Sequence, residues 1–446
     1  PHACRPRACK QISLKQQFAK MMQRPEIKEL SNIQIFKPQS TTLDNGIDMK
    51  SISIGDQPVS RLDIIFEGGR CDGRNQTVSE MLSAILREGT TSLNAQEIAE
   101  ALDYHGAWLG CDASSHNATL SLYSLNRNFE KVVPILADIV MNPSFPEQEL
   151  SNLKSLAANR LRINRQKVAF LAMETFARLH FGEGSNLGKV VSENDIESIT
   201  TEELSKFHKQ WFAPQNMSVI LSGKVEGQMF DVVNNCFGKT PVTGAPQQSA
   251  TDSPSIKFKP DTVVVDKPDA LQSAVRMGMP TVLRSDADYI PLRILVTALG
   301  GYFGSRLMTN IREDKGYTYG ISASLLGYRN NSFISISCQC DTSHTWQVAK
   351  EIKTEIEKLQ NDTIPDDELR RLKSFMISDL ARTLDTPFSI ADYYASLPIN
   401  HISHANFERP LATINSISAS SLLDIAQRRL SSAEMLTVVA GNAKEL

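Results

Sequence analysis

Long apolar runs are missing from this sequence of 446 residues, and no segment has the length needed to span a lipid bilayer. The basic N-terminal stretch also lacks the apolar segment of a secretory signal. We therefore expect no membrane association and a cytoplasmic protein, with the periplasm or the mitochondrial matrix as alternatives. A strong charge of one sign is missing too. The formal net charge of -3 provides no field to attract nucleic acid, so we expect no nucleic-acid partner.

Cysteine is scarce and scattered, which is typical of free thiols in a reducing compartment. There are seven cysteines, and only Cys4/Cys9 and Cys338/Cys340 lie close together in sequence. The second pair belongs to the segment FISISCQCD, which predicts a strand, because alternate residues share one face and no further cysteine pair follows to complete a zinc site.

The eight histidines form neither of the common zinc motifs, H-x-x-E-H or H-E-x-x-H. His401 and His404 are close to each other, but no acidic residue lies near them. A catalytic zinc needs three protein ligands, so we expect a solvent-facing pair at these positions. The sequence shows no catalytic triad that would favour a peptidase acting alone.

The length and apolar content fit two domains of about 200 residues each. The stretch GKTPVTGAPQQSATDSPSIKFKPD is rich in Pro, Gly, Ser and Thr and has no apolar periodicity, which indicates a linker. We predict an N-terminal extension at residues 1–40, a first domain at 41–237, a linker at 238–261 and a second domain at 262–446.

The two predicted domains repeat one pattern. VVPILADIVMNPSFPEQELSNLKS, from Val132, aligns with VAKEIKTEIEKLQNDTIPDDELRRLKS, from Val348, at an offset of 219 residues. MSVILSG and MLTVVAG match at an offset of 218. Nearly equal offsets indicate a duplication. Short β-branched runs such as RLDIIF alternate with helical patterns such as NAQEIAEALDYHG, which predicts α/β domains with helices packed on a sheet.

The segment FEGGRCDGRNQTVSEMLSAILREGTTSLNAQEIAEALDYHG and its continuation to Leu150 resemble the N-terminal domain of the pitrilysin, insulinase and mitochondrial processing peptidase family. The resemblance extends over Thr42 to Leu446, with the second half similar to the family's second domain. It implies an α/β (α+β) fold of two homologous domains, each a mixed, mostly antiparallel sheet covered by helices.

The family's zinc motif is replaced in this chain. In the family, H-x-x-E-H lies on the helix just before a Gly-Thr dipeptide, which is Gly89-Thr90 here. The resemblance places the two histidine positions at Glu80 and Ala84 and the general base at Ser83. The third ligand, a glutamate on a later helix, falls on Arg160.

These replacements cannot supply a catalytic zinc site, which needs three protein ligands and a water. Ala84 has no lone pair, Ser83 cannot take a proton from water near neutral pH, and Arg160 repels a cation. We therefore expect no zinc cofactor in this chain. Helical periodicity predicts an apolar face for this helix and places Glu80, Ser83, Ala84 and Arg87 on the opposite side.

A second family feature is retained. GGYFGSRLMTNIREDKGYTYG contains Arg312 and, seven residues later, Tyr319. The resemblance implies that this Arg/Tyr pair holds the substrate backbone and the carbonyl under attack, a role for which both side chains are suitable hydrogen-bond donors. The structural alternative is a helix-end cation at 312 and a packed strand aromatic at 319.

Family members bind peptides by adding them to a sheet edge, and the segment Asp112 to Leu122 occupies the place of that edge strand. A chain without zinc ligands but with the Arg/Tyr pair resembles the second subunit of two-chain members. We expect an inactive subunit of a heterodimeric metalloendopeptidase, whose zinc-bearing homologous partner would cleave short or unfolded peptides. The alternative is a catalytically inactive scaffold, like the core proteins of respiratory complexes.

Overall fold

The computed structural model describes residues 33, 36–247, 254, 256–399, 402–403 and 408–446. The chain from Ile35 to Leu446 forms one compact unit. The predicted N-terminal extension, the middle of the predicted linker and the pair His401/His404 lie largely or wholly outside the described residues. In the described part of the chain, no helix is both long enough and apolar enough to cross a membrane.

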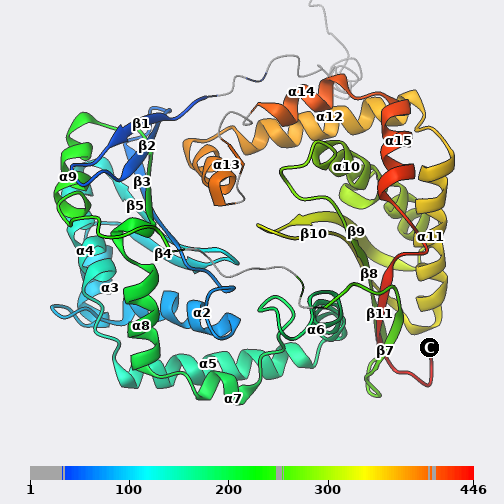
Figure 1. The fold of residues 1–446 in the computed structure, drawn as a ribbon, viewed down its shortest axis with the longest axis horizontal. Helices are drawn as coiled ribbons and strands as arrows, with labels where there is room; N and C mark the ends of the chain where they lie inside the picture. The colour runs from blue at the N-terminus through cyan, green and yellow to red at the C-terminus, as the bar shows by residue number, and fades with distance from the viewer. Residues whose placement is uncertain (1–32, 34–35, 248–253, 255, 400–401, 404–407) are drawn as a thin grey trace, which may run out of the picture. The chain divides into compact units, whose positions relative to one another are not determined.

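The first sheet has six strands in the order β1-β2-β6-β3-β5-β4 (Figure 1). Only β2 and β6 are parallel, and the other neighbours are antiparallel. The central strand β3 is buried along almost its whole length, as its VSRLDIIFE sequence predicts. The bounds are β1 Gln39–Thr42, β2 Asp48–Ser53, β3 Val59–Glu67, β4 Trp108–Ala113, β5 Asn117–Leu125 and β6 Met217–Gly223.

The second sheet has five strands in the order β7-β11-β8-β10-β9, and only β7 and β11 are parallel. The predicted strand FISISCQCD is confirmed as β10. The bounds are β7 Thr262–Asp266, β8 Gln272–Pro280, β9 Thr318–Gly327, β10 Ser332–Asp341 and β11 Leu436–Gly441. The predicted fold class, two mixed and mostly antiparallel sheets covered by helices, is thus confirmed.

Helices cover both sheets, with α4 and α9 beside the first sheet and α11 and α15 beside the second (Figure 1). The first half contains α2 Gln76–Ile85, α3 Ala95–Tyr104, α4 Phe129–Met141, α5 Glu147–Arg165, α6 Val168–Phe181, α7 Glu193–Glu197, α8 Thr201–Trp211 and α9 Gly227–Phe237. The second half contains α10 Tyr289–Val296, η4 Thr297–Gly301, η5 Met308–Asp314, α11 Thr345–Asn361, α12 Asp366–Thr383, α13 Pro387–Ile399, α14 Arg409–Ser416 and α15 Ala419–Arg429.

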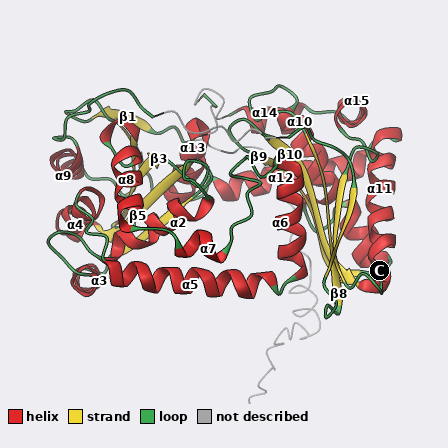
Figure 2. Cartoon of the chain, turned by 60° about the horizontal axis from the view of Figure 1, so that its bottom comes forward, coloured by secondary structure: helices red, strands yellow, loops and turns green. Residues whose placement is uncertain are grey.

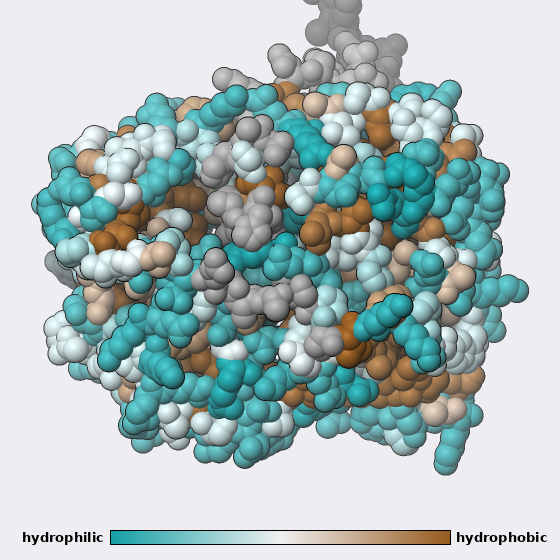
Figure 3. All heavy atoms as spheres, in the orientation of Figure 1, coloured by the Kyte–Doolittle hydropathy of each residue, from teal (hydrophilic) through white to brown (hydrophobic). Residues whose placement is uncertain are grey.

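Apolar side chains form a separate core against each sheet. On the face in Figure 3, hydrophilic residues cover most of the surface, and hydrophobic residues gather in several separate groups. This distribution is ordinary for a folded protein, because polar groups are too few to cover the whole surface.

One helix of each half packs on the sheet of the other half. Helix α6 lies against β8 and β11, where Phe176 and Ala172 join Ala274 and Val438 in a shared apolar cluster (Figure 2). Its counterpart α13 contacts β2 and β6 of the first sheet. The helix α6 therefore belongs by sequence to the predicted first domain but by packing to the second sheet, because its apolar face has its partners there.

A buried arginine connects α13 to the first sheet. Arg61 of β3 is only 4% exposed, and its Nε donates to Asp63 at 2.8 Å. Its Nη2 donates to Asp392 of α13 at 2.6 Å and to the Phe388 carbonyl at 3.1 Å, while Nη1 donates to Tyr123 at 3.0 Å. All three guanidinium nitrogens thus donate a hydrogen bond, which offsets the cost of burying the positive charge.

Candidate functional site

Helix α2 carries the positions of the missing zinc motif. Asn75 immediately precedes it, and the Asn75 side chain accepts a hydrogen bond from the Thr77 amide at 3.0 Å and so caps the first turn. The helix packs against β4, α5 and α8. Ser83, expected opposite the apolar face of this helix, is buried as well, with only 4% of its surface exposed. Among the described residues, its hydroxyl has no hydrogen-bond partner.

Glu80 faces two cations. Its side chain is 49% exposed, and Oε1 lies 3.4 Å from Nη1 of Arg70. Arg70 is held in place because its Nε donates to the Ala113 carbonyl at 3.1 Å. Burial raises the pKa of Glu80, whereas the charges of Arg70 and Arg160 lower it, so Arg160 on α5 is close enough to act on this carboxylate.

These residues do not fit a zinc ion. One carboxylate between two guanidinium groups gives a local charge that opposes cation binding, and the half-buried Ala84 adds no ligand. In the part of the chain that the structure describes, no group of three or more His, Cys, Asp or Glu side chains is placed to hold a metal. Arg70 was not singled out in the sequence, because its segment FEGGRCDG shows no sign of the fold that brings it to α2.

We predict that the protein purified alone contains far less than one zinc per chain, measured by elemental analysis after dialysis. The triple variant Glu80→His/Ser83→Glu/Ala84→His should still fail to bind zinc, because Arg160 and Arg70 remain and position 83 is buried. Adding Arg160→Glu and Arg70→Gln should raise the zinc content. Tight zinc binding by the triple variant alone would show that the third ligand lies elsewhere.

A β-bulge determines the direction of Tyr319. Two residues of β9, Tyr319 and Gly320, stand opposite the single residue Gln339 of β10. In a regular ladder Tyr319 would pair with Cys340, whose side chain is buried in the core. The extra residue gives that place to Thr318 and leaves Tyr319 93% exposed. The alternative of a packed strand aromatic at 319 is therefore wrong.

The Thr318 hydroxyl stabilises this bulge. It donates to the Gln339 carbonyl at 2.6 Å and accepts from the Gly320 amide at 3.0 Å. These bonds join backbone groups of both strands at the place where the ladder is interrupted.

We expect Thr318→Val, which keeps the shape but removes the hydroxyl, to lower the free energy of unfolding by about 1–3 kcal/mol, because a backbone amide and carbonyl lose their partner. Urea denaturation measures this change. Thr318→Ser keeps the hydroxyl and should remain close to the wild-type protein. Equal stabilities of the two variants would show that the hydroxyl does not support the bulge.

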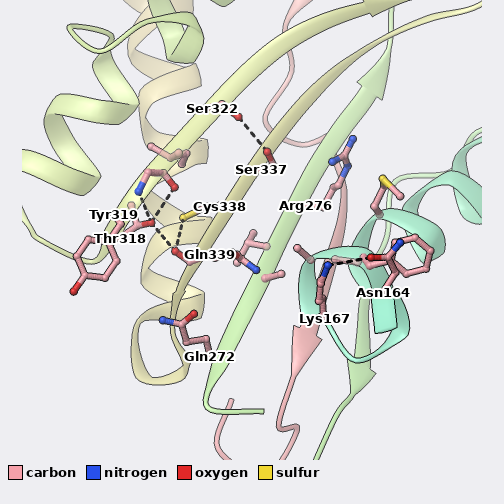
Figure 4. Close-up of a pocket in the computed structure, with 18 of the residues that line it drawn as sticks. Asn164, Lys167, Gln272, Arg276, Thr318, Tyr319, Ser322, Ser337, Cys338 and Gln339 are labelled. Carbon is pink, nitrogen blue, oxygen red and sulfur yellow. Dashed lines mark hydrogen bonds between the residues drawn. The ribbon is translucent and has the colours of Figure 1, made fainter. Parts of the chain in front are cut away.

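Tyr319 lines a cavity of ≈ 880 Å³ on the exposed face of the second sheet. The cavity lies over β8, β9 and β10 and is closed on another side by the end of α5 and the start of α6 (Figure 4). The other polar residues that line it are Asn164, Lys167, Gln272, Arg276, Thr318, Ser322, Ser337, Cys338 and Gln339.

Arg312 lies on η5, directly before β9, and is not among the residues that line this cavity. Its guanidinium carbon is 4.8 Å from the centre of the Phe303 ring, which is a cation–π contact. Arg312 is in the last turn of η5, so the description as a helix-end cation fits its place. The structure thus brings Tyr319, rather than both members of the Arg/Tyr pair, to the cavity.

The free edge of the first sheet also differs from the prediction. The strand β5 pairs with β3 on one side and β4 on the other, so the edge strands of the described sheet are β4, Trp108–Ala113, and β1. The predicted segment Asp112 to Leu122 includes the end of β4, the turn and most of β5, and is therefore wrong as an edge strand. The chain turns back after Ala113, and the alternating apolar residues that follow belong to the inner strand β5.

Two models of one peptidase family match this chain. The model described as Insulinase (Peptidase family M16) matches residues 55–180, and the model described as Peptidase M16 inactive domain matches residues 198–376. The chain belongs to peptidase family M16. The H-x-x-E-H motif is absent from its sequence, and the model that matches its second half is the one described as the inactive domain.

Two curated proteins and one solved structure resemble the chain over most of its length. An uncharacterized zinc protease of Mycobacterium leprae is 23% identical over 370 residues, which cover 81% of this chain and 82% of that protein. The non-peptidase homolog YmxG of Helicobacter pylori is 23% identical over 361 residues, covering 77% and 81%. The crystal structure of a peptidase M16 inactive domain from Pseudomonas fluorescens matches with a TM-score of 0.78 and 21% identity, covering 91% and 98%. This last likeness concerns the M16 fold alone.

Proposed function

We propose that this M16 chain is the zinc-free subunit of a two-chain metalloendopeptidase. In this proposal a homologous partner supplies the zinc, and this chain supplies Tyr319 and Arg312 to the peptide held between them. The observation that carries the proposal is Tyr319, which a bulge turns out of the core and leaves exposed at the edge of a cavity.

The bulge supports a functional role for Tyr319 because it has a structural cost. It interrupts the ladder between β9 and β10 and needs the Thr318 hydroxyl to satisfy the backbone. A tyrosine at this position adds no buried apolar area that would offset the cost. An exposed phenol can donate a hydrogen bond to a developing oxyanion without ionising first.

The strand that carries Tyr319 suits a peptide substrate. In the part of the chain that the structure describes, β9 is an edge strand of the second sheet, so one side of its backbone has no neighbouring strand. An extended peptide can pair with such an edge through main-chain hydrogen bonds, which favours short or unfolded substrates of varied sequence. The names of the relatives include a zinc protease and a non-peptidase homolog, so both kinds of chain occur among the proteins that this one resembles.

Reconstitution with a zinc-bearing M16 homologue from the same organism tests the proposal. Co-expression should give a stable heterodimer on gel filtration, and this complex should cleave unstructured peptides that neither chain cleaves alone. A chelator should abolish the cleavage through the partner's zinc.

Two results would count against this function. Separate monomer peaks at micromolar concentration would contradict a shared site, because catalysis needs groups aligned to within about half an ångström. A stable complex without peptidase activity would favour the scaffold role, with which the helix-end position of Arg312 agrees.

A further inference from the structure

The cavity beside Tyr319 has basic side chains and no acidic counterpart. Arg276 lines it from β8 and Lys167 from the start of α6, whereas its described lining residues include no Asp or Glu (Figure 4). Most arginines and lysines in folded proteins are solvated or paired with carboxylates. Two cations at one concave site without an acid give a local positive potential despite the chain's formal net charge of -3.

Arg276 is the more confined of these two cations. Its Nε is buried and has no hydrogen-bond partner among the residues that the structure describes. The guanidinium carbon lies 5.6 Å from the centre of the Phe176 ring, so α6 covers one face of the group. Burial lowers the pKa of this guanidinium, although Tyr328 acts in the opposite direction.

Hydroxyl groups continue from Arg276 across the sheet. In the strand register Arg276 of β8 pairs with Ser337 of β10, which pairs with Ser322 of β9. Directly opposed residues share one face of a sheet, so the three side chains form a polar row on the cavity floor. The two serine hydroxyls are 3.1 Å apart. This row leads from the cation to the edge strand that carries Tyr319.

Lys167 adds a second positive charge at the start of α6. Its Nζ donates to Asn164 at 3.0 Å, and the residue stands immediately before α6. The first turn of α6 has neither an acidic residue nor a side-chain cap, so its positive dipole end has no compensating group there. The helix end strengthens the positive potential of Lys167 and Arg276.

We infer that Arg276 and Lys167 select peptide substrates with an acidic side chain, whose carboxylate enters the cavity while the peptide backbone lies along β9. This inference rests on the proposed function and adds a substrate class to it. A guanidinium can bind a carboxylate through two parallel hydrogen bonds, and the ammonium adds a point charge. The serine hydroxyls and Gln339 can donate to the remaining oxygen lone pairs.

A binding experiment with the chain alone tests this selection without any partner or catalysis. Two fluorescently labelled unstructured peptides of equal length would differ only by one Glu→Gln exchange. Fluorescence anisotropy should show that the wild-type chain binds the Glu peptide about tenfold or more tightly at low salt, and that the preference shrinks as ionic strength rises.

Variants assign the preference to the two cations. Arg276→Gln and Lys167→Gln should each reduce the discrimination, and the double variant should bind both peptides equally. Arg276→Glu should reverse the preference toward a Lys peptide. The matched control Arg370→Gln removes an exposed arginine of α12 outside the cavity and should keep the wild-type preference. Circular dichroism and thermal melts check that each variant is folded.

The outcomes separate this inference from the proposed function. If the wild-type chain binds both peptides equally and Tyr319→Ala weakens both, the peptide site stands and the acidic preference is overturned. If Arg276→Gln and Lys167→Gln keep the full preference, the cavity does not hold the carboxylate and the inference is wrong. If neither peptide binds at millimolar concentration, both the inference and the proposed peptide surface are overturned.

Discussion

Tyr319→Phe should lower the turnover of the reconstituted heterodimer about a hundredfold or more, as the loss of one oxyanion donor typically does. The ring and its place on the bulge stay, and only the hydroxyl is removed. Peptide binding should change much less, because the hydrogen bond strengthens as negative charge develops on the attacked carbonyl. Steady-state kinetics on an unstructured peptide separates the two effects.

Tyr317→Phe is the matched control for this prediction. Tyr317 lies two residues before Tyr319 but stacks on His344, with ring centres 4.3 Å apart. Removing the Tyr317 hydroxyl should therefore leave turnover unchanged. Arg312→Ala should lower both turnover and affinity if its guanidinium positions the peptide backbone. Full activity of the Tyr319→Phe heterodimer would show that the Arg/Tyr pair is structural here, and the scaffold role would become the better account.

The sequence predicted the fold because its evidence was periodic and repeated. Two matches at nearly the same offset showed the duplication, and alternating β-branched runs located the central strands β3, β6 and β10. The loss of metal ligands was equally visible, since it depends on residue type at a known spacing. Such features need no knowledge of contacts between distant segments.

The features that the sequence left open all depend on tertiary contacts. Helical periodicity placed Ser83 opposite the apolar face of α2, but the packing around this helix buries Ser83 as well. The direction of Tyr319 depends on one extra residue in the register with β10, which alternation along β9 alone does not reveal. The interaction of Arg70 with Glu80 and the packing of α6 and α13 on the opposite sheets join segments that are far apart in sequence.

The reciprocal packing of α6 and α13 gives Arg61 a large role in stability. We expect Arg61→Ala to lower the free energy of unfolding by about 3–5 kcal/mol, because it leaves the buried Asp63 carboxylate without its cation. Asp392→Ala should cost less than about 1 kcal/mol, since 68% of that side chain is exposed and water can replace the lost contact. The double variant Arg61→Met/Asp63→Asn removes both buried charges and should recover most of the loss. Urea denaturation with all three variants measures the series.

The pH dependence shows whether the charge of Asp63 causes the loss. Burial raises the pKa of Asp63 to about 6, although Arg61 acts in the opposite direction. Removing Arg61 raises this pKa further, so the folded variant binds a proton that the unfolded chain, with a pKa near 3.8, does not. Its stability therefore falls as pH rises through this window, and the deficit of Arg61→Ala against the wild-type protein should be smaller at pH 5 than at pH 8. A deficit that is the same at both pH values would mean that Arg61 stabilises the contact with α13 through packing on Tyr123 and Phe388 rather than through its charge.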